Sequence, residues 1–327
     1  MLQLVLDTHG LTVKKRNKCF YVIGKKSRRM ISPQKLSSIL ITTEVNMSTA
    51  AILLAAQHGI AVIYVDRNGK VRARLWSPHF VGTAQLRLAQ MAYSQEVGAT
   101  RWMKQLILYK LQSQLEHIEK IQAKVEDQTA CRAVVKSIGE TLVRIDQLAE
   151  VSPEQVRPNL LGLEGAASQA YWRIVGQSVP VFWQFRLRSR RPATDCTNAA
   201  LNYCYGMLYQ LVEEKCLAVG LDPQIGMLHQ IQYGKPVLAF DGVEVFRHWV
   251  DEWVLELCRS GRLQASDFDQ KETAVYVGKG GKRILIPQFR QWLQRPRIWR
   301  SISRSVNNHI YQWMLELAQA IRNTSSL

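Results

Sequence analysis

The stretch IAVIYVDRNGKVRARLW, residues 60–76, contains two strand-like segments that are joined at Asn68-Gly69. An Asn-Gly pair between runs of apolar and β-branched residues is typical of a two-residue hairpin turn. After Pro78 the pattern changes, because apolar residues recur every three or four positions with charged residues between them. This is the spacing of amphipathic helices. The chain is therefore predicted to form strands before residue 80 and helices after it.

The residues before this hairpin also favour strands. Three further segments are rich in β-branched or aromatic residues and are separated by turn residues: LQLVLD (2–7), CFYVI (19–23) and LSSILIT (36–42). Between the last of them and the hairpin, an apolar segment that Ser48 or Thr49 can cap and Gly59 can end predicts one short helix. We expect residues 1–80 to form a small β-rich domain.

The remaining residues, 81–327, are expected to form a larger helical domain. Helical periodicity predicts helices at 84–97, 101–125, 131–151, 159–175, 194–219, 244–260 and 301–321. One β-hairpin is expected among them in AVYVGKGGKRILI (274–286), with GKGG as its turn. The fold class is therefore α+β, a small N-terminal β-rich domain followed by a larger all-α domain with one inserted hairpin.

Charge and composition indicate the kind of partner. The 327 residues include 43 Lys and Arg against 26 Asp and Glu, a formal charge of +17, with 47% hydrophobic residues. This composition is that of a folded protein, and the positive charge favours a polyanion such as DNA because phosphate contacts release counterions. No apolar run reaches the roughly 20 residues of a membrane-spanning helix. The N-terminus lacks the basic and apolar regions of a signal peptide, so we expect a cytoplasmic protein.

The six cysteines do not form a metal-binding pattern. They are scattered along the chain without a CxxC pair, so a zinc site built from them is not expected. Packed or reduced free thiols are the simpler interpretation.

Three basic clusters could contact phosphates. The first is the segment 14–29, which has eight basic residues and no acidic one. It fits either a solvated hairpin edge or direct phosphate contact. The second precedes a helix that Thr194 or Asp195 can cap, and it consists of Arg186, Arg188, Arg190 and Arg191. The third lies in the Gly-rich turn GKGG and consists of Lys279, Lys282 and Arg283.

Two polar residues follow the arginine cluster on the predicted helix. Asn198 and Tyr203 are placed to orient a backbone or a catalytic group. For the arginine cluster a solvated basic loop remains the alternative interpretation.

Glu164 is the most unusual acidic residue on physical grounds. In the sequence GLEGAASQAYW it falls in line with Leu160, Ala167 and Tyr171 on the expected buried face of a helix. A buried carboxylate costs several kcal/mol unless it is paired, hydrogen-bonded or bound to a cation. The neighbouring glycines and alanines leave room for a ligand. A Glu near a helix start, favoured by the helix dipole, is the alternative.

Three further residues lie in short, unusual sequence frames. His229 follows a turn at Asp222-Pro223, and Asp241 and Glu244 are three residues apart, so they share one face of a helix that begins near residue 240. This arrangement serves a metal site, and it equally serves a packed histidine and an acidic first helical turn. His248 lies one turn further along the same face and is treated as secondary.

In combination, four motifs are recognisable: LGLEGAASQAYW, SRRPATDCTNAALNYCYG, PQIGMLHQIQYGKPVLAFDGVEVFR and, in the β-rich part, SPQKLSSILITTEVNMSTAAILLAAQHGIAVIYVD. Their order and spacing over nearly the whole chain resemble the CRISPR-associated spacer-acquisition integrases, the metal-dependent DNA endonucleases of CRISPR adaptation. The resemblance implies metal ligands at Glu164, His229 and Glu244, with Asp241 as a neighbouring acid that is also part of the catalytic set. Gly242 departs from the family, which usually has a large apolar residue there, and Lys235-Pro236 replaces a usual arginine and small residue.

The resemblance also implies an activity and its partners. The expected reaction is attack of a 3′-hydroxyl of a DNA fragment, the spacer, on a phosphodiester of the CRISPR repeat, with Mg²⁺ or Mn²⁺ as cofactor. The N-terminal domain is expected to form a homodimer. A small ferredoxin-like adaptation protein is expected to bridge two such dimers into a heterohexameric complex.

Two alternative functions remain open from the sequence. One is a metal-dependent nuclease of branched or single-stranded DNA that performs no integration. The other is a non-catalytic basic protein that coats nucleic acid, in which the acidic residues only cap helices.

Overall fold

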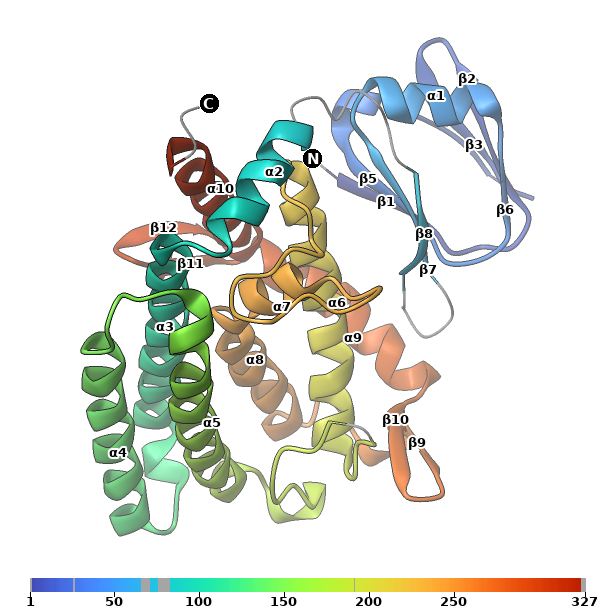
Figure 1. Ribbon diagram of the computed structural model, residues 1–327. Helices are drawn as coiled ribbons and strands as arrows, with labels where there is room; N and C mark the ends of the chain where they lie inside the picture. Colours follow the sequence, from blue (N-terminus) through green and yellow to red (C-terminus); the bar gives the residue numbers. More distant parts are fainter. Residues whose placement is uncertain (1, 26, 66–70, 76–82, 191, 325–327) are drawn as a thin grey trace. The chain divides into compact units, whose positions relative to one another are not determined.

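The computed structural model describes residues 2–25, 27–65, 71–75, 83–190 and 192–324 (Figure 1). The chain divides into two compact units, one that extends through Ala84 and one that begins at Gln85. The first is rich in strands and the second is mostly helical, which confirms the α+β fold class. The predicted domain boundary at residue 80 and the Asn68-Gly69 turn lie outside the described residues. No helix among the described residues is long and apolar enough to cross a membrane.

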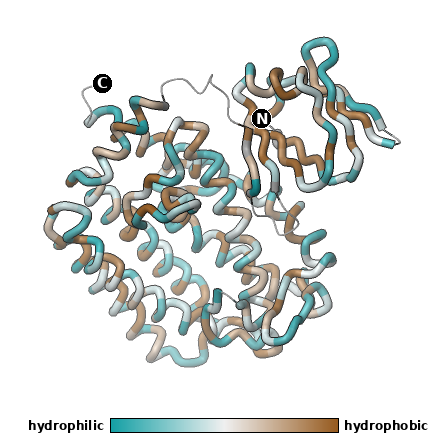
Figure 2. Tube along the Cα trace, turned by 45° about the vertical axis from the view of Figure 1, so that its right-hand side comes forward, coloured by the Kyte–Doolittle hydropathy of each residue, from teal (hydrophilic) through white to brown (hydrophobic). Residues whose placement is uncertain are grey.

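The N-terminal unit contains two four-stranded sheets. In the first, β1 (Leu2–Leu6), β5 (Leu36–Ile41) and β7 (Ala61–Val65) are parallel and β8 (Val71–Arg74) is antiparallel to β7. In the second, the order is β4 (Arg28–Ile31), β3 (Cys19–Ile23), β2 (Leu11–Arg16) and β6 (Val45–Met47), with only β2 and β6 parallel. Hydrophobic residues concentrate along these strands (Figure 2), and Val13, Phe20 and Ile39 are fully buried.

The helix predicted in this unit is confirmed. It is α1 (Thr49–Gln57), whose first turn is capped by Ser48 Oγ accepting from the Ala51 amide at 3.3 Å. Gly59, with φ +62°, follows its end. The 3₁₀ turn η1 (Pro33–Lys35) precedes β5.

The basic segment 14–29 lies on the strands β2, β3 and β4. A tight turn joins β2 to β3, and both of its residues, Asn17 and Lys18, have positive φ. Lys14, Lys15 and Arg16 are exposed at the end of β2. The hairpin interpretation of this segment therefore agrees with the structure, and the strands β2, β4 and β6 were not predicted.

The second unit is built from nine α-helices within the described residues. They are α2 (Thr83–Tyr93), α3 (Val97–Ile121), α4 (Gln128–Asp146), α5 (Pro153–Ser178), α6 (Cys196–Ala218), α7 (Val237–Glu244), α8 (Arg247–Arg259), α9 (Lys279–Gln294) and α10 (Val306–Thr324). Two hairpins, β9 (Phe268–Lys271) with β10 (Ala274–Val277) and β11 (Pro296–Trp299) with β12 (Ile302–Ser305), and three 3₁₀ turns, η2 (Gln122–Lys124), η3 (Val181–Trp183) and η4 (Ala265–Asp267), connect them. The helices α3, α4 and α5 pack side by side (Figure 1).

The hairpin predicted at 274–286 was wrong in its second half. β10 pairs with β9, which precedes it, and the residues after Gly278 begin α9 instead of a return strand. Leu285, Phe289 and Trp292 follow at helical spacing and are buried, so a helix hides them on one face. The glycines are needed because Asp267 lies within 2.6 Å of where a Cβ of Gly280 would stand.

Three of the predicted helices also differ in extent. The helix expected from residue 301 begins at Val306, because residues 302–305 form β12. α5 begins at Pro153 and runs through Pro158, which the sequence placed before the helix start. The helix expected at 244–260 is divided into α7 and α8 at Val245 and Phe246. The division places Glu244 at the end of α7 and His248 in the first turn of α8.

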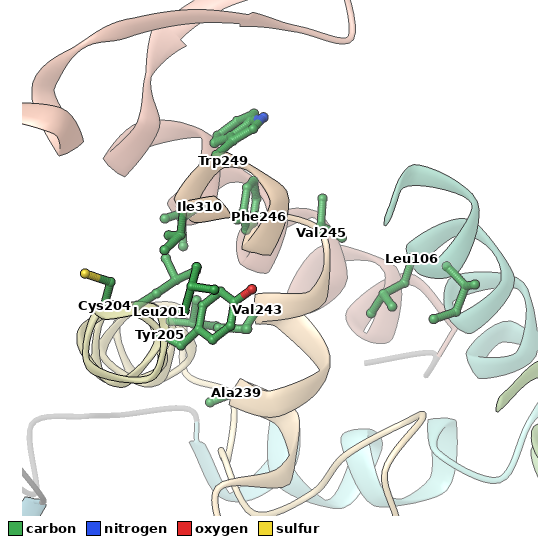
Figure 3. Packing of buried hydrophobic residues seen from close by; sticks show 14 of the residues in the cluster. Leu106, Leu201, Cys204, Tyr205, Ala239, Val243, Val245, Phe246, Trp249 and Ile310 are labelled. Atoms are coloured by element: carbon green, nitrogen blue, oxygen red, sulfur yellow. The ribbon is translucent and has the colours of Figure 1, made fainter. Parts of the chain in front are cut away.

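An aromatic core surrounds this division. Val243, Val245 and Phe246 are fully buried and lie between α6, which contributes Leu201 and Tyr205, and Leu106 of α3 (Figure 3). Trp102 and Trp313 stack nearby with ring centroids 5.5 Å apart. All six cysteines are free and four of them are buried. This dense apolar core therefore fixes α7, the helix that carries Asp241 and Glu244.

Gly242 is explained by the side chains that pack on it. A Cβ at this position would lie 2.8 Å from Met314 Sδ and 2.9 Å from Val212 Cγ1. Met314 of α10 thus fills the space that a larger residue at 242 would occupy.

We expect Gly242→Leu to lower the free energy of unfolding by about 1–3 kcal/mol through overpacking. Met314→Ala alone should cost about 2–5 kcal/mol because it leaves a cavity. The double variant should lose less than the sum, since each change relieves the other. Urea denaturation of the four proteins measures this, and strictly additive losses would contradict the packing argument.

Candidate metal and nucleic-acid site

Two carboxylates converge on one ammonium group in the interior of the helical unit. Lys110 Nζ donates to Glu164 Oε1 and, at 2.5 Å, to Glu244 Oε2. The three side chains are 9%, 17% and 9% exposed, respectively. A carboxylate on the inner face of a helix requires a partner. For Glu164 this partner is Lys110, which the sequence analysis did not single out.

Lys110 belongs to a series of polar pairs between α3 and α5. Lys110 pairs with Glu164, Gln114 Nε2 lies 3.5 Å from Ser168 Oγ, and His117 Nδ1 lies 2.6 Å from the Tyr171 hydroxyl. Residue numbers rise together in both helices, so α3 and α5 run parallel. The spacing of four and three residues keeps each series on one helical face.

Glu244 is held as an anion by two cations. Burial raises its pKa, but the charges of Arg247 and Lys110 outweigh burial and bring it to about 2. Arg247 Nη1 donates to Glu244 Oε1 at 2.5 Å, and its guanidinium lies over the Tyr205 ring, 4.6 Å from the centroid. Each oxygen of Glu244 therefore faces a different cation.

Asp241 lies behind His229. Its Oδ2 accepts from the amides of Met227 and Leu228 at 2.7 and 3.0 Å, and its Oδ1 accepts from the His229 amide at 2.9 Å and from His229 Nδ1 at 2.6 Å. The side chain is fully buried. With four donors on two oxygens, Asp241 fixes the turn and the histidine ring, a structural role that the sequence did not distinguish from ligation.

His229 consequently presents Nε2 away from Asp241. Burial lowers the pKa of His229, but the hydrogen bond to Asp241 and the charges of Asp241 and Glu244 raise it above its usual value. Nε2 has no hydrogen-bond partner among the described residues, and the side chain is 36% exposed. A histidine whose Nδ1 is committed to a carboxylate is a common arrangement for metal ligation through Nε2.

A cavity of about 300 Å³ opens beside Glu164. Its lining includes acidic, basic and aromatic side chains: Lys110, Gln114, Glu164, Gly165, Ser168, Gln169, Trp172, Leu187, Arg188, Arg190, Tyr205, Arg247, His248 and Asp251. A Cβ at Gly165 would meet nothing within 4 Å. The small residues around Glu164 therefore leave this side of α5 open, as the sequence indicated.

Asp251 is a buried acid that the sequence analysis missed. It accepts hydrogen bonds from the hydroxyls of Tyr205 and, at 3.1 Å, Tyr171. Burial raises its pKa to about 6, against the opposing effects of the Tyr205 hydrogen bond and the Arg247 charge. On the single helix that was predicted at 244–260, Asp251 would lie two turns after Glu244 on the same face, and this was the available signal.

The predicted arginine cluster is divided by the structure. Arg188 and Arg190 line the cavity with Glu164. Arg186 is exposed and lines a different hollow beside Gly176 and Phe185. Arg191 lies outside the described residues.

Asn198 supports the loop that carries these arginines. Its Oδ1 accepts from Arg188 Nη1 at 2.8 Å and from the Ser189 amide at 2.9 Å, while its Nδ2 donates to the Leu187 carbonyl at 2.9 Å. Asp195 caps α6 by accepting from the Asn198 amide. The orienting role predicted for Asn198 agrees with these contacts.

The remaining predicted residues lie apart from the cavity. Tyr203 faces Lys282, whose Nζ is 5.9 Å from its ring centroid. Lys279 and Arg283 are exposed in the first turns of α9. On α6, positions 203 and 205 point to opposite sides, so Tyr205 and not Tyr203 reaches the site. Tyr203 does not line the cavity beside Glu164, and its supporting role stays a prediction.

The donor set suits a hard divalent cation. Glu164 and Glu244 already share one cation, and His229 is near enough for its pKa to respond to Glu244. Carboxylate oxygens with one imidazole fit Mg²⁺ or Mn²⁺. Within the described part of the chain no three His, Cys, Asp or Glu side chains are already arranged around one point. The residues fit a metal once the Lys110 ammonium moves away.

The sequence model of the family described as CRISPR associated protein Cas1 matches residues 4–291. The chain belongs to the Cas1 family. It is 33% identical over 287 residues to a CRISPR-associated endonuclease Cas1 of Thermodesulfovibrio yellowstonii, covering 86% of this chain and 87% of that one. A second relative, the endonuclease Cas1 of Archaeoglobus fulgidus, is 30% identical over 299 residues, 87% and 86% of the two chains.

Solved structures share the fold of this Cas1 chain. A casposase bound to an integration product superimposes with a TM-score of 0.77 at 22% identity, over 100% of this chain and 92% of that chain. TM1797, a Cas1 protein from Thermotoga maritima, gives 0.77 at 19% identity over 98% and 97%. A Cas6-RT-Cas1--Cas2 complex gives 0.79 at 20% identity over 99% of this chain and 35% of that one. At these identities the likeness concerns the fold.

We expect Asp241→Ala to destabilise the protein and Glu164→Ala to leave stability nearly unchanged. The first leaves three buried amides without an acceptor, at about 1–3 kcal/mol each, so a loss of about 3 kcal/mol or more is expected. The second leaves Lys110 paired with Glu244, and a change within about 1 kcal/mol is expected. Urea denaturation measures both, and equal losses would contradict the assignment of Asp241 as the scaffold of the turn.

We expect His248 to make stability depend on pH. Burial lowers its pKa to about 3, so between pH 6.5 and 4.5 the unfolded chain binds a proton there that the folded chain excludes. Stability is therefore lost as pH falls, by up to about 1.4 kcal/mol per pH unit from this residue. In His248→Gln the slope of unfolding free energy against pH should be smaller by about that amount; an unchanged slope would contradict it.

Proposed function

We propose that this Cas1 chain is a divalent-metal-dependent DNA strand-transferase that inserts DNA fragments into a CRISPR array. The observation that carries the proposal is the meeting of Glu164 and Glu244 at Lys110, with Glu164 beside a cavity lined by Arg188 and Arg190. His229 lies close enough to Glu244 for the charge of Glu244 to affect its pKa. Acidic ligands for a metal and basic contacts for phosphate thus lie within one site. A solved structure with the same fold is described as a casposase bound to an integration product, which supports strand transfer as the reaction.

In the proposed reaction the 3′-hydroxyl oxygen of the fragment forms a bond to a phosphorus atom of the repeat. The phosphodiester bond to the repeat's own 3′-oxygen breaks, the attacking hydroxyl gives its proton to water, and the departing oxygen takes one up. One phosphodiester replaces another, so the step needs no external energy source. Hydrolysis is the same step with water as the nucleophile.

Glu164, His229 and Glu244 would hold Mg²⁺ or Mn²⁺. When bound, such an ion polarises the phosphoryl oxygens and stabilises the negative charge of the departing oxygen. Asp241 contributes by fixing Nδ1 of His229, so that Nε2 is the nitrogen available for ligation. Arg247 keeps Glu244 anionic, which ligation requires.

Arg188 and Arg190 would hold the DNA backbone in the cavity. Arg188 is positioned by Asn198 and by Asn202, whose Oδ1 accepts from its Nη2 at 2.6 Å. A guanidinium fixed in this way loses little freedom when it binds a phosphate. Contacts to a backbone position the substrate without reading its sequence.

We propose that the chain works in an assembly with DNA and a second protein. A homodimer is assigned to the N-terminal unit, and a small ferredoxin-like protein would bridge two dimers in a heterohexamer. Solved structures that share the fold are described as a Cas6-RT-Cas1--Cas2 complex and as a Cas1–DNA complex. These descriptions support DNA and a second Cas protein as partners.

A nuclease without integration is the second candidate, because the relatives are named endonucleases. A labelled fragment with free 3′ ends, incubated with a supercoiled repeat-bearing plasmid and the partner protein, separates the two. Joining of label to plasmid supports strand transfer. Cleavage of DNA without joining supports the nuclease.

We expect Glu164→Ala, His229→Ala and Glu244→Ala each to lower Mn²⁺-dependent strand transfer by at least about 100-fold, because each removes a ligand of the ion that stabilises the departing oxygen. DNA affinity, measured by fluorescence anisotropy, should stay within about threefold of the wild type. The exposed acid Glu116 of α3 provides the control variant Glu116→Ala, which should keep full activity. Full activity in all three site variants would refute the metal assignment and would favour a protein that only binds nucleic acid.

A further inference from the structure

Lys110 lies where the two proposed carboxylate ligands of the metal meet. Its ammonium bonds to Glu164 Oε1 and lies 2.5 Å from Glu244 Oε2. We propose that Lys110 is an internal counter-ion that keeps the metal-free site folded and must be displaced by the divalent cation. The inference rests on the proposed function, since it concerns the same two carboxylates.

The metal-free site needs a cation of its own. Glu164 and Glu244 are 17% and 9% exposed, and two nearby carboxylates with little solvent repel each other strongly. Arg247 neutralises only Glu244, through Oε1. Lys110 completes the balance, because two carboxylates then face two cations.

Charge also explains why the ammonium has to leave. With Lys110 and Arg247 both in place, the two carboxylates are neutralised, and a divalent ion would add two uncompensated positive charges. Lys110 Nζ already bonds to both carboxylates, so an ion held by the two carboxylates would compete with it. The ion and the ammonium are therefore alternatives, and the affinity for metal is lowered by the cost of displacing Lys110.

Of the two cations, Lys110 is the one that can move. Arg247 has a planar guanidinium that lies over the Tyr205 ring, 4.6 Å from its centroid, and its Nη1 bonds to Glu244 Oε1. Lys110 has a flexible four-carbon side chain and lines the cavity of about 300 Å³ that also contains Arg188 and Arg190. A displaced ammonium would enter this cavity, where it would face a bound phosphate together with the two arginines.

The test compares Mn²⁺ binding in the wild type and in Lys110→Met, measured by isothermal titration calorimetry after treatment with EDTA. We expect the variant to bind Mn²⁺ at least about tenfold more tightly, which corresponds to about 1.4 kcal/mol. Its melting temperature should fall in EDTA and should be raised by Mn²⁺ more than that of the wild type. Lys110→Arg, which keeps the charge, should bind Mn²⁺ no more tightly than the wild type. If Lys110→Met does not fold, Lys110→Gln takes its place.

Lys104 provides a matched control. It is a second buried lysine of α3, and its Nζ donates to the carbonyls of Asp146 and Leu148 at 2.9 and 2.7 Å instead of to Glu164 or Glu244. Lys104→Met should lower the melting temperature equally with EDTA and with Mn²⁺, and should leave the affinity for Mn²⁺ unchanged.

The outcomes separate the two proposals. Equal or weaker Mn²⁺ binding by Lys110→Met, with normal binding by the wild type, overturns the counter-ion role and leaves the proposed function standing. Mn²⁺ binding that persists unchanged in Glu164→Ala overturns the metal assignment itself. If neither the wild type nor Lys110→Met binds Mn²⁺, both proposals fall.

Discussion

Two carboxylates enclosed by helices, Glu164 and Glu244, impose the constraint on which the rest of the site depends. A carboxylate that is largely removed from water must face a cation, and here Lys110 and Arg247 supply one each. These pairings determine which helices must meet. Lys110 comes from α3, Glu164 from α5, and Glu244 and Arg247 from either side of the division between α7 and α8. The break between α7 and α8 therefore contributes to charge pairing as well as to core packing.

Around this centre, rigid and adaptable parts are distinguished by their contacts. The carboxylate of Asp241 accepts four hydrogen bonds, which fill its usual acceptor positions. Asp241 therefore holds the turn that carries His229. Asn198 does the same for Arg188. Lys110, Arg190 and the imidazole of His229 reach the cavity or solvent and can respond to a ligand. The family motif PQIGMLHQIQYGKPVLAFDGVEVFR thus contains both a structural support, Asp241, and a proposed ligand, His229.

The sequence predicted the outline of the fold and part of the site, for identifiable reasons. Alternation and helical periodicity located most elements. The GKGG segment was assigned to a hairpin because its glycines suggested a turn. In the structure these glycines instead allow α9 to pack against Asp267. Glu164 was identified because it interrupts an apolar line. His229, Asp241 and Glu244 depended on the family resemblance. The sequence analysis missed Lys110 because a lysine on a long helix is ordinarily exposed to solvent. Only its pairing with Glu164, which lies 54 positions later in the chain, makes it unusual. Tyr203 and Tyr205 could not be separated without knowing which face of α6 is inward.

The parallel packing of α3 and α5 has a consequence for how such chains can diverge. Lys110, Gln114 and His117 face Glu164, Ser168 and Tyr171 in the same order and with the same steps. A single inserted or deleted residue within either group of eight would rotate the following positions by about 100° and misalign the remaining pairs. The two turns that flank α4 carry none of these pairs and are under no such restriction. Length variation between related chains is therefore tolerable in these turns and is excluded within the two groups of eight.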